Sequence, residues 1–366
     1  MNSGPKYYFP QLDAVRGLSF LAVYFFHAFH PKFGPGLFSR MCDFFYQNLI
    51  LSIDVFFILS SFLLTWLGIN EYKAKGNFSF INYFIRRALR IWPLYFILMV
   101  FAFVVVPYAS NYFNMPVTLP PAYYYLLFIA NFYQEGHVYF LQFLWTLSVE
   151  EQFYLLWGIC LLLFQKRLMT CVVVLTALSL CYTAYAMLNN VQHYFNTLTY
   201  LFDFAIGIQA AVLMHRKNRV VRFFKNMSKR HNLLFFLSLP FMFIIIFSLI
   251  NLAPGALTPW FDLLGRYLFI IFTGLLIIEQ MVNENSLLKL KSQRFLIYTG
   301  KISYGLYCFH GIVLTFGLVV LQKLNITMPV IVKGLLFLAI NYIISAISYR
   351  FIEKPFLQLK NKLRRI

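Results

Sequence analysis

Charged residues are scarce in this chain, and acidic residues are the scarcest. The 366 residues include 31 lysines and arginines but only 12 aspartates and glutamates, which together amount to 12%. A soluble domain normally carries about 25% charged residues. Because 61% of the residues are hydrophobic, the polar side chains cannot cover a surface that faces water on all sides. This composition excludes an ordinary soluble globular protein.

Long polar segments are also absent, and the chain shows no clear repeat and no low-complexity segment. The first apolar stretch, Leu12–His30, lacks the features of a cleavable signal peptide. It contains Asp13, Arg16 and His27, and no small-residue cleavage site follows it. We therefore expect a single integral membrane domain over residues 1–366, without an appended soluble domain.

Cysteine is rare and shows no pattern. The cysteines form no CxxC pair and no metal-ligand spacing, and four of the five lie in apolar stretches; they are Cys42, Cys160, Cys171, Cys181 and Cys308. We expect them to be small buried hydrophobic residues. The sequence thus predicts no metal site, and we expect no permanently bound cofactor.

Apolar stretches dominate the chain instead. About ten of them have the roughly 18–22 residues needed to cross a hydrocarbon core of about 30 Å. Examples are Leu12–His30, Leu49–Gly68, Ile91–Tyr108, Leu233–Leu252 and Ile331–Ile352. The segment Ala122–Tyr133 is apolar but too short to span. The prediction is an all-α, polytopic transmembrane bundle of about ten spanning helices, plus this one short re-entrant or interfacial segment.

The positive charges indicate the topology. They gather in five clusters: Lys73, Lys75, Arg86, Arg87 and Arg90; Lys166 and Arg167; residues 216–230; Lys289, Lys291, Arg294 and Lys301; and residues 354–365. The connections near 109–121, 189–197 and 253–262 carry no lysine or arginine. By the positive-inside rule, the clusters and both termini are cytoplasmic in a multi-pass protein of the cell membrane. The net charge of +19 therefore reflects topology and membrane lipid, and we expect no nucleic-acid partner.

Four acidic residues lie inside predicted spans. Each charge at the bilayer centre costs about 2.5–3.5 kcal/mol on insertion scales, so such residues must be paired, protonated or in a wet cavity. The four are Asp54, Glu150, Glu151 and Asp203. On the predicted topology all four lie in the outer halves of their helices, which suggests a polar substrate cavity open to the outside.

Arg16 and His27 stand on one face of the first predicted helix. At about 100° per residue, positions 11 apart differ by about 20°, and they lie roughly 16 Å apart along the axis. A cation and an imidazole at different depths fit a passage for a long anionic ligand. The alternative is that Arg16 reaches toward lipid phosphates while His27 bonds a neighbouring helix.

Two further pairs of charged residues could act on a ligand in such a passage. Arg87 and Arg90 are neighbours on one helical face and could clamp phosphates at the cytoplasmic mouth, or they could be ordinary positive-inside anchors. The adjacent Glu150 and Glu151 point about 100° apart, so only one can face a given partner squarely. That carboxylate could orient an imidazole or act as a base, or it could be a structural ion pair.

Six blocks of residues, in order along the chain, resemble the membrane acyltransferase-3 family. They are Leu12–Leu18 with His27, Ile53–Thr65, Arg87 and Arg90 before Trp92-Pro93, Trp145–Tyr154, Ile302–His310, and Phe351–Phe356. Any one block is a weak signal, but six in order over residues 12–356 are a strong one. Ser61 stands where the family usually has glycine, a departure expected to affect helix packing.

The resemblance implies an O-acyltransferase with a core of ten helices. Such enzymes take an acyl group, usually acetyl, from cytoplasmic acyl-CoA and deliver it to a hydroxyl, usually of a surface glycan. We expect His27 to be the general base, oriented by Glu150 or Glu151, since histidine titrates near neutral pH. Arg87 and Arg90 are expected to hold the donor phosphates, with help from Arg16, while Asp54, Asp203 and His310 line the substrate cavity.

Some family members carry a C-terminal hydrolase-like domain that completes the transfer. This sequence has few residues after its last apolar stretch. We therefore expect it either to modify the glycan acceptor directly or to pass the acyl group to a separate acyl-accepting protein. A transporter or flippase for a glycan or lipid-linked sugar is the alternative, because buried acids suit that class too. The internal repeat typical of many transporters is not seen.

Overall fold

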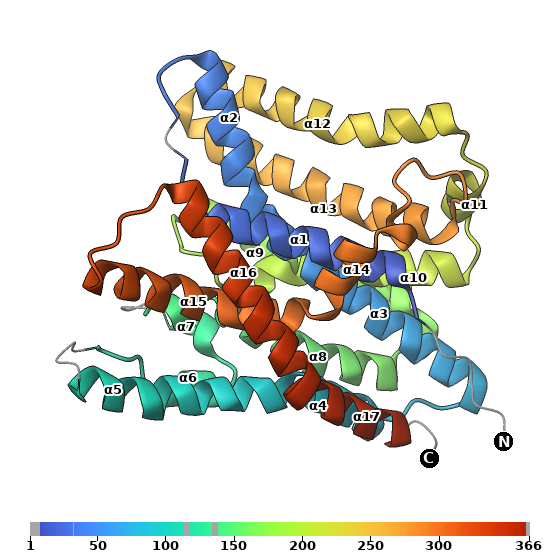
Figure 1. Ribbon diagram of the computed structural model, residues 1–366. Coiled ribbons are helices and arrows are strands. Elements are labelled where there is room, and N and C mark those ends of the chain that lie inside the picture. Colours follow the sequence, from blue (N-terminus) through green and yellow to red (C-terminus); the bar gives the residue numbers. More distant parts are fainter. Residues whose placement is uncertain (1–7, 32, 113–116, 134–137, 364–366) are drawn as a thin grey trace.

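The computed structural model describes residues 8–31, 33–112, 117–133 and 138–363, which form helices joined by short connections and contain no strand. Ten long helices form the bundle (Figure 1): α1 (Pro10–Ala28), α3 (Ser52–Lys75), α4 (Phe80–Val100), α8 (Trp145–Leu163), α9 (Leu168–Leu188), α10 (Leu201–His215), α12 (Lys229–Leu252), α13 (Thr258–Val282), α15 (Ser303–Lys323) and α16 (Val330–Ser348). The all-α membrane fold predicted from the sequence is confirmed.

Shorter elements connect these helices. The short α-helices are α2 (Leu37–Gln47), α5 (Val106–Tyr112), α6 (Ala122–Leu126), α7 (Tyr139–Gln142), α11 (Arg219–Lys225), α14 (Arg294–Lys301) and α17 (Lys354–Leu363). Two π-helical turns, η2 (Phe101–Val105) and η8 (Tyr349–Glu353), extend α4 and join α16 to α17. The 3₁₀ turns are η1 (Asn48–Leu51), η3 (Ala130–Phe132), η4 (Gln165–Arg167), η5 (Thr197–Tyr200), η6 (Gly255–Leu257) and η7 (Leu290–Ser292).

Nine helical stretches among the described residues are long and apolar enough to cross a membrane. The tenth predicted span is α1, which has 19 residues and lies within the bundle (Figure 1) but carries Asp13, Arg16 and His27. The short segment at 122–133 forms α6 and η3, and five helical residues rise only about 8 Å. It therefore does not span, as predicted.

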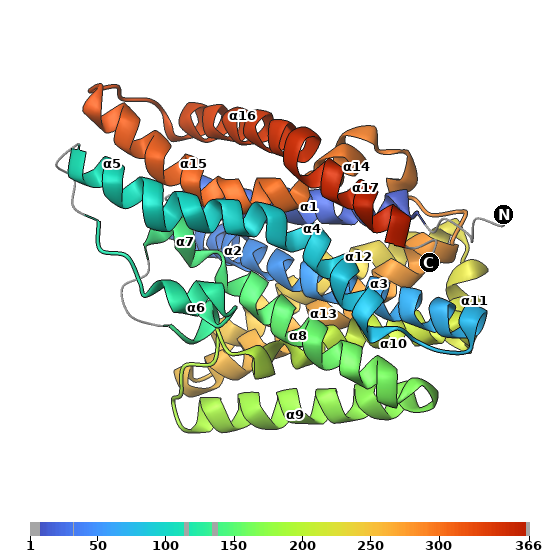
Figure 2. The ribbon, with the colours of Figure 1, turned by 90° about the horizontal axis from the view of Figure 1, so that it is seen from below.

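The basic clusters gather at one end of the bundle. The α3–α4 and α8–α9 connections, α11, α14 and α17 all lie toward the end where α1 begins (Figures 1 and 2). Arg364 and Arg365 of the last cluster lie outside the described residues. The opposite end, where α2, α6 and α7 lie, is not free of cations, since Arg40 belongs to α2 and Lys323 and Lys333 lie near the α15–α16 connection. We call these the basic end and the opposite end.

The helices differ in how much of their surface is covered. The most apolar window of α12 is 17% buried, whereas that of α10 is 67% buried. α10 is therefore central, and α12 presents most of its side chains outward, as a lipid-facing helix does. The close approach of α3 and α10 depends on Gly207, where an added Cβ would clash with the Ile58 carbonyl oxygen and with Ser61 Oγ. Ser61 is fully buried at this contact between α3 and α10.

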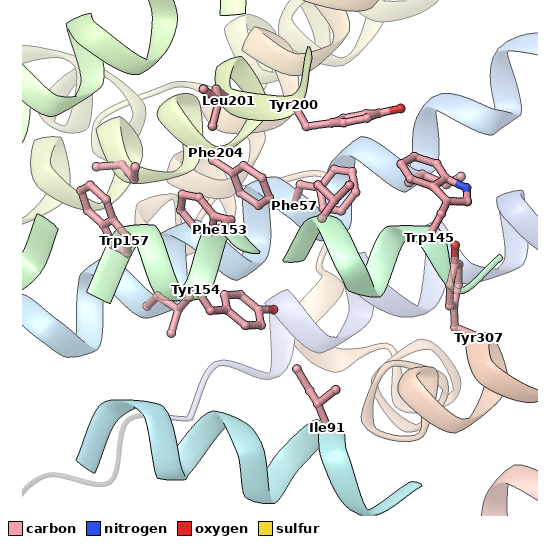
Figure 3. Packing of buried hydrophobic residues seen from close by; sticks show 14 of the residues in the cluster. Phe57, Ile91, Trp145, Phe153, Tyr154, Trp157, Tyr200, Leu201, Phe204 and Tyr307 are labelled. Carbon is pink, nitrogen blue, oxygen red and sulfur yellow. The ribbon is translucent and has the colours of Figure 1, made fainter. Parts of the chain in front are cut away.

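Aromatic packing sets the orientation of α8. Phe153 stacks on Phe204 of α10 with ring centroids 3.7 Å apart, and Phe57 of α3 packs against Phe204 at 5.2 Å. Figure 3 shows Phe153 and Tyr154 leaving α8 on different sides, with Tyr154 toward the side of Ile91 on α4. The apolar face of α8 thus packs on α10, and its polar face is left for α1, α3 and α4.

Candidate active site

A small cavity in the middle of the bundle collects three arginines and one carboxylate. It has a volume of about 70 Å³ and is lined by α1, α3, α4, α8 and α15. We call it the inner cavity; its polar lining is Arg16, Ser60, Arg87, Arg90, Thr146, Glu150, Tyr154, Ser303, Tyr304 and Tyr307. A cavity this rich in guanidinium groups can accept an anionic group.

Arg87 differs from its neighbour in the sequence. Arg86 pairs with Glu71 at 2.7 Å, as a positively charged helix end commonly does. Arg87 is only 6% exposed, and its guanidinium lies 5.7 Å from the centre of the Tyr154 ring. Among the described residues, no carboxylate lies within ion-pair distance of Arg87 or Arg90. Burial distinguishes Arg87 from an anchor that merely faces lipid headgroups.

Arg16 and Glu150 complete the charged lining. Arg16 is 7% exposed and has Asp13, one turn earlier on α1, at 3.7 Å. Glu150 accepts hydrogen bonds from Ser60 Oγ and from Tyr154 OH, each at 2.9 Å. These two hydroxyls hold the Glu150 carboxylate in the lining of the cavity, which it shares with Arg16 and the two α4 arginines.

The structure corrects the expected pairing of His27 with Glu150 or Glu151. The Glu150 carboxylate is bound by Ser60 and Tyr154, and Glu151 Oε2 accepts a hydrogen bond of 3.4 Å from Trp92 Nε1. The two acids point to different sides because adjacent residues on a helix are about 100° apart. Among the described residues, neither carboxylate forms a hydrogen bond or an ion pair with His27.

His27 lies in a second cavity of about 600 Å³ nearer the opposite end, which we call the histidine pocket. The pocket is lined by aromatic and polar residues, including Tyr46, Gln47, Tyr139, Gln142, Phe143, Trp145 and Tyr194. The His27 ring packs edge-on against Phe143, with centroids 4.5 Å apart. Its Nε2 atom is buried and makes no hydrogen bond within the described part of the chain.

His310 of α15 is the titratable side chain that faces His27. The centroids of the two imidazole rings are 5.7 Å apart, and Phe143 touches both rings. His310 Nδ1 lies 2.5 Å from the Tyr307 carbonyl oxygen. Since a carbonyl only accepts, Nδ1 carries the proton, and Nε2 of the neutral ring is left as an acceptor. That Nε2 is also buried and has no partner among the described residues.

The two cavities adjoin. Ile53 lines both, and Trp145 of the histidine pocket precedes Thr146 of the inner cavity on α8. At the junction, Thr146 Oγ1 donates a hydrogen bond of 3.0 Å to Tyr307 OH. Arg16 and His27, on one helix and roughly 16 Å apart by the helical rise, therefore line successive cavities along the bundle.

Asp54 and Asp203, expected in a substrate cavity, line neither the inner cavity nor the histidine pocket. Both pair with Arg266 of α13: Asp54 Oδ2 lies 3.0 Å from Arg266 Nε, and Asp203 Oδ2 lies 2.7 Å from Arg266 Nη2. The two acids are 4% and 0% exposed. Charges buried this deeply must be paired, and the resulting ion triad ties α3, α10 and α13 together.

The sequence reasoning missed Arg266, although a signal was available. Arg266 lies within an apolar stretch, as the four acids do, and the rule that flagged them applies to it equally. Ser60, Tyr154, Thr146 and Tyr307 fall within the blocks that resemble the family. Their roles as hydrogen-bond partners could not be read from the sequence, because hydroxyls are common in buried helices.

Comparison with known proteins agrees with these blocks. Residues 9–350 match the family model of the acyltransferase domain. The peptidoglycan O-acetyltransferase OatA of Listeria monocytogenes is 28% identical over 372 residues, which cover 95% of this chain and 56% of that protein. The YrhL protein of Bacillus subtilis, provisionally named a peptidoglycan O-acetyltransferase, is 26% identical over 95% of this chain and 55% of its own length.

The chain thus spans little more than half the length of these relatives, and no solved structure matches it. The family match nevertheless runs through α1, α3, α4, α8 and α15, which form the inner cavity. On this evidence the chain belongs to the membrane acyltransferase-3 family and is an acyltransferase.

Proposed function

We propose that this protein is an O-acetyltransferase of the cell membrane. It would move an acetyl group from cytoplasmic acetyl-CoA to a hydroxyl of a glycan at the outer face. The observation that carries the proposal is the succession of two cavities, an arginine-lined one followed by a histidine-lined one. The names of the relatives, which refer to O-acetyl transfer and to peptidoglycan, support this choice of group and acceptor.

The inner cavity suits the donor. Coenzyme A carries several phosphates, and arginine forks bind phosphate in two-point contacts. We assign Arg87 and Arg90 to the phosphates and Arg16 to the donor further along the passage. The basic end would then be cytoplasmic, which agrees with the positive-inside rule and places both termini inside the cell. In this reading acetyl-CoA is a substrate, and the protein holds no resident cofactor.

The histidine pocket suits the transfer itself. In the proposed reaction, His27 accepts the proton of the acceptor hydroxyl as the hydroxyl oxygen attacks the thioester carbonyl carbon. The new C–O bond forms while the C–S bond breaks, and His27 returns the proton to the departing thiolate. His310 faces His27 at 5.7 Å and presents an unprotonated Nε2, so it can help to hold the transferred proton or a bridging water.

A reconstituted assay tests this function. Purified protein in liposomes is given acetyl-CoA with a labelled acetyl group and purified peptidoglycan strands, and both released CoA and labelled glycan are measured. The expected result is stoichiometric CoA release and glycan labelling, which His27→Ala lowers by about 10²-fold or more without loss of membrane insertion. Glycan that crosses the bilayer unmodified, without CoA release, would instead identify a transporter. If labelling required an added acyl-accepting protein, direct transfer to the glycan would be wrong.

A further inference from the structure

A third hollow, larger than either of the two cavities above, lies apart from them. It is a cleft of about 910 Å³ at the opposite end, bounded by α2 and the loop before it, by α12 and α13, and by the end of α9 with the loop that follows. We call it the polar cleft. Its charged and amide lining includes Arg40, Asp43, Gln47, Asn251, Asp262 and Arg266.

The chemistry of this lining fits a carbohydrate. Carboxylate and amide side chains exchange hydrogen bonds with the hydroxyl and acetamido groups of sugars. Asp43, Asn251 and Asp262 are exposed. Asp43 Oδ1 accepts a hydrogen bond from Gln47 and Asn251 Nδ2 donates one to the Phe247 carbonyl oxygen, which leaves the other carboxylate oxygens of the two aspartates for sugar hydroxyls. Phe44 and Phe247 add apolar walls, against which the C–H faces of sugar rings can pack. The volume is at the upper end of the range for small-molecule sites, about 300–1,000 Å³, and leaves room for more than one sugar unit.

The helix α2 forms a shared wall between the polar cleft and the histidine pocket. Arg40, Asp43 and Gln47 fall on one face of α2 at helical spacing and line the cleft. Gln47 also lines the histidine pocket. Its Nε2 donates to Asp43 Oδ1 at 3.2 Å. Gln47 thus links the polar lining of the two hollows.

Contacts on both sides hold α2 in this place. Tyr46 OH donates to the Phe26 carbonyl oxygen at 2.6 Å and accepts from the His30 backbone N–H at 3.0 Å. These bonds fasten α2 beside the end of α1 that carries His27. On its other side, Phe44 packs against Phe247 of α12 with centroids 5.5 Å apart. The distance between the cleft and His27 is thereby set by packed elements.

We propose that the polar cleft binds the sugar units that flank the one being acetylated, so that the protein selects an extended glycan chain as its acceptor. This inference rests on the proposed function and deepens it. One sugar would present its hydroxyl to His27 in the histidine pocket, while its linked neighbours lie across Gln47 against Asp43 and Asp262. Chains with more units than the histidine pocket holds should then be better acceptors than short ones.

Acceptor length tests the proposal directly. The reconstituted full chain is assayed with acetyl-CoA and with peptidoglycan fragments of two, four and six sugar units. For the wild type, KM should fall at least about tenfold from the disaccharide to the longer fragments. Asp43→Ala and Asp262→Asn should each raise KM for the longer fragments several-fold and the double variant should remove the length dependence. KM for acetyl-CoA should stay unchanged, and KM for the disaccharide, which has a single linked unit to place in the cleft, should rise less than KM for the longer fragments.

Asn189→Ala serves as the matched control. Asn189 is exposed near the same end, bonds the Tyr185 carbonyl oxygen of its own helix, and does not line the cleft. If one aspartate variant fails to insert into the membrane, the other variant still tests the proposal, because the two aspartates lie on different elements. The cleft is not an acceptor site if KM of the wild type does not depend on fragment length. The same conclusion follows if KM of the double variant still depends on it. Absence of transfer to fragments of every length would instead refute the proposed function.

Discussion

His27 of α1 and His310 of α15 face each other with their ring centroids 5.7 Å apart, and neither Nε2 atom has a hydrogen-bond partner among the described residues. The two residues are far apart in the sequence, and no carboxylate in the described part of the chain forms an ion pair with His27. The Tyr307 carbonyl oxygen holds the proton of His310 on Nδ1. This leaves a lone pair on Nε2 in the neighbourhood of the proposed base.

Replacing His27 by alanine should reduce acetyl transfer by about 10²- to 10⁴-fold, the usual contribution of a general base. His310→Phe keeps a ring against Phe143 but removes both nitrogens, and should lower kcat by about tenfold or more. KM for acetyl-CoA should change little in either variant, since the arginines lie in the other cavity. Rates of acetyl transfer at a series of acetyl-CoA concentrations give kcat and KM for each variant. His231→Phe is the control, because His231 is exposed near the basic end. Full activity of His310→Phe would exclude a role of His310 in proton transfer.

Replacing Arg87 and Arg90 by alanine should raise KM for acetyl-CoA at least about tenfold, because a hydrogen bond to a charged group contributes about 1.5–3 kcal/mol. KM for the glycan should change much less. Lysine at both positions should restore only part of the affinity, since it lacks the planar fork. Arg167→Ala removes an exposed cation from the same end and should leave both constants unchanged. If KM for acetyl-CoA were the same in the wild type and the double variant, these arginines would act only as positive-inside signals of topology.

Arg266→Ala should destabilise the protein strongly, by about 3–5 kcal/mol, because it strands Asp54 and Asp203 as buried unpaired charges. Replacing all three residues by apolar ones of similar size should be less damaging than the single change. Thermal unfolding in detergent, followed by tryptophan fluorescence, measures the effect. Arg40→Ala, an exposed cation in α2, is the comparison. If Arg266→Ala melted at the wild-type temperature, the triad would have no structural role.

Gly207→Ala should weaken the contact between α3 and α10. The new Cβ would meet both Ser61 Oγ and the Ile58 carbonyl oxygen, and such overpacking typically costs about 1–3 kcal/mol. Adding Ser61→Gly removes only the first clash, so the double variant should recover part of the lost thermal stability. Gly255→Ala, where an added Cβ meets nothing within 4 Å, should melt like the wild type. No difference between these glycine variants would contradict the tight packing.

The orientation in the membrane can be read from two engineered cysteines in a variant that lacks the five native ones. Arg167 lies in η4 at the basic end, and Gly255 lies in η6 at the opposite end. With an impermeant thiol reagent on intact cells, Gly255→Cys should react and Arg167→Cys should react only after the membrane is opened. The reverse pattern would place the termini outside and remove the donor from the inner cavity.

Sequence alone was sufficient for the parts of this protein that depend on local chemistry. Runs of apolar residues long enough for a bilayer predicted the spanning helices, and the 12-residue run at 122–133 was too short to be one. The 3.6-residue period placed Arg16 and His27 on one face of α1. Ordered motifs from residue 12 to residue 356 indicated the family that comparison then confirmed.

The partners across helices were decided only by the tertiary structure. A helical period tells which residues share a face, but it does not tell which neighbouring helix that face meets, because an apolar bundle can be assembled in many ways. Glu150 therefore met Ser60 and Tyr154, and not His27. The packing of α1 against α15 brought His310 to His27, and the packing of α3 and α10 beside α13 brought Arg266 to the two aspartates.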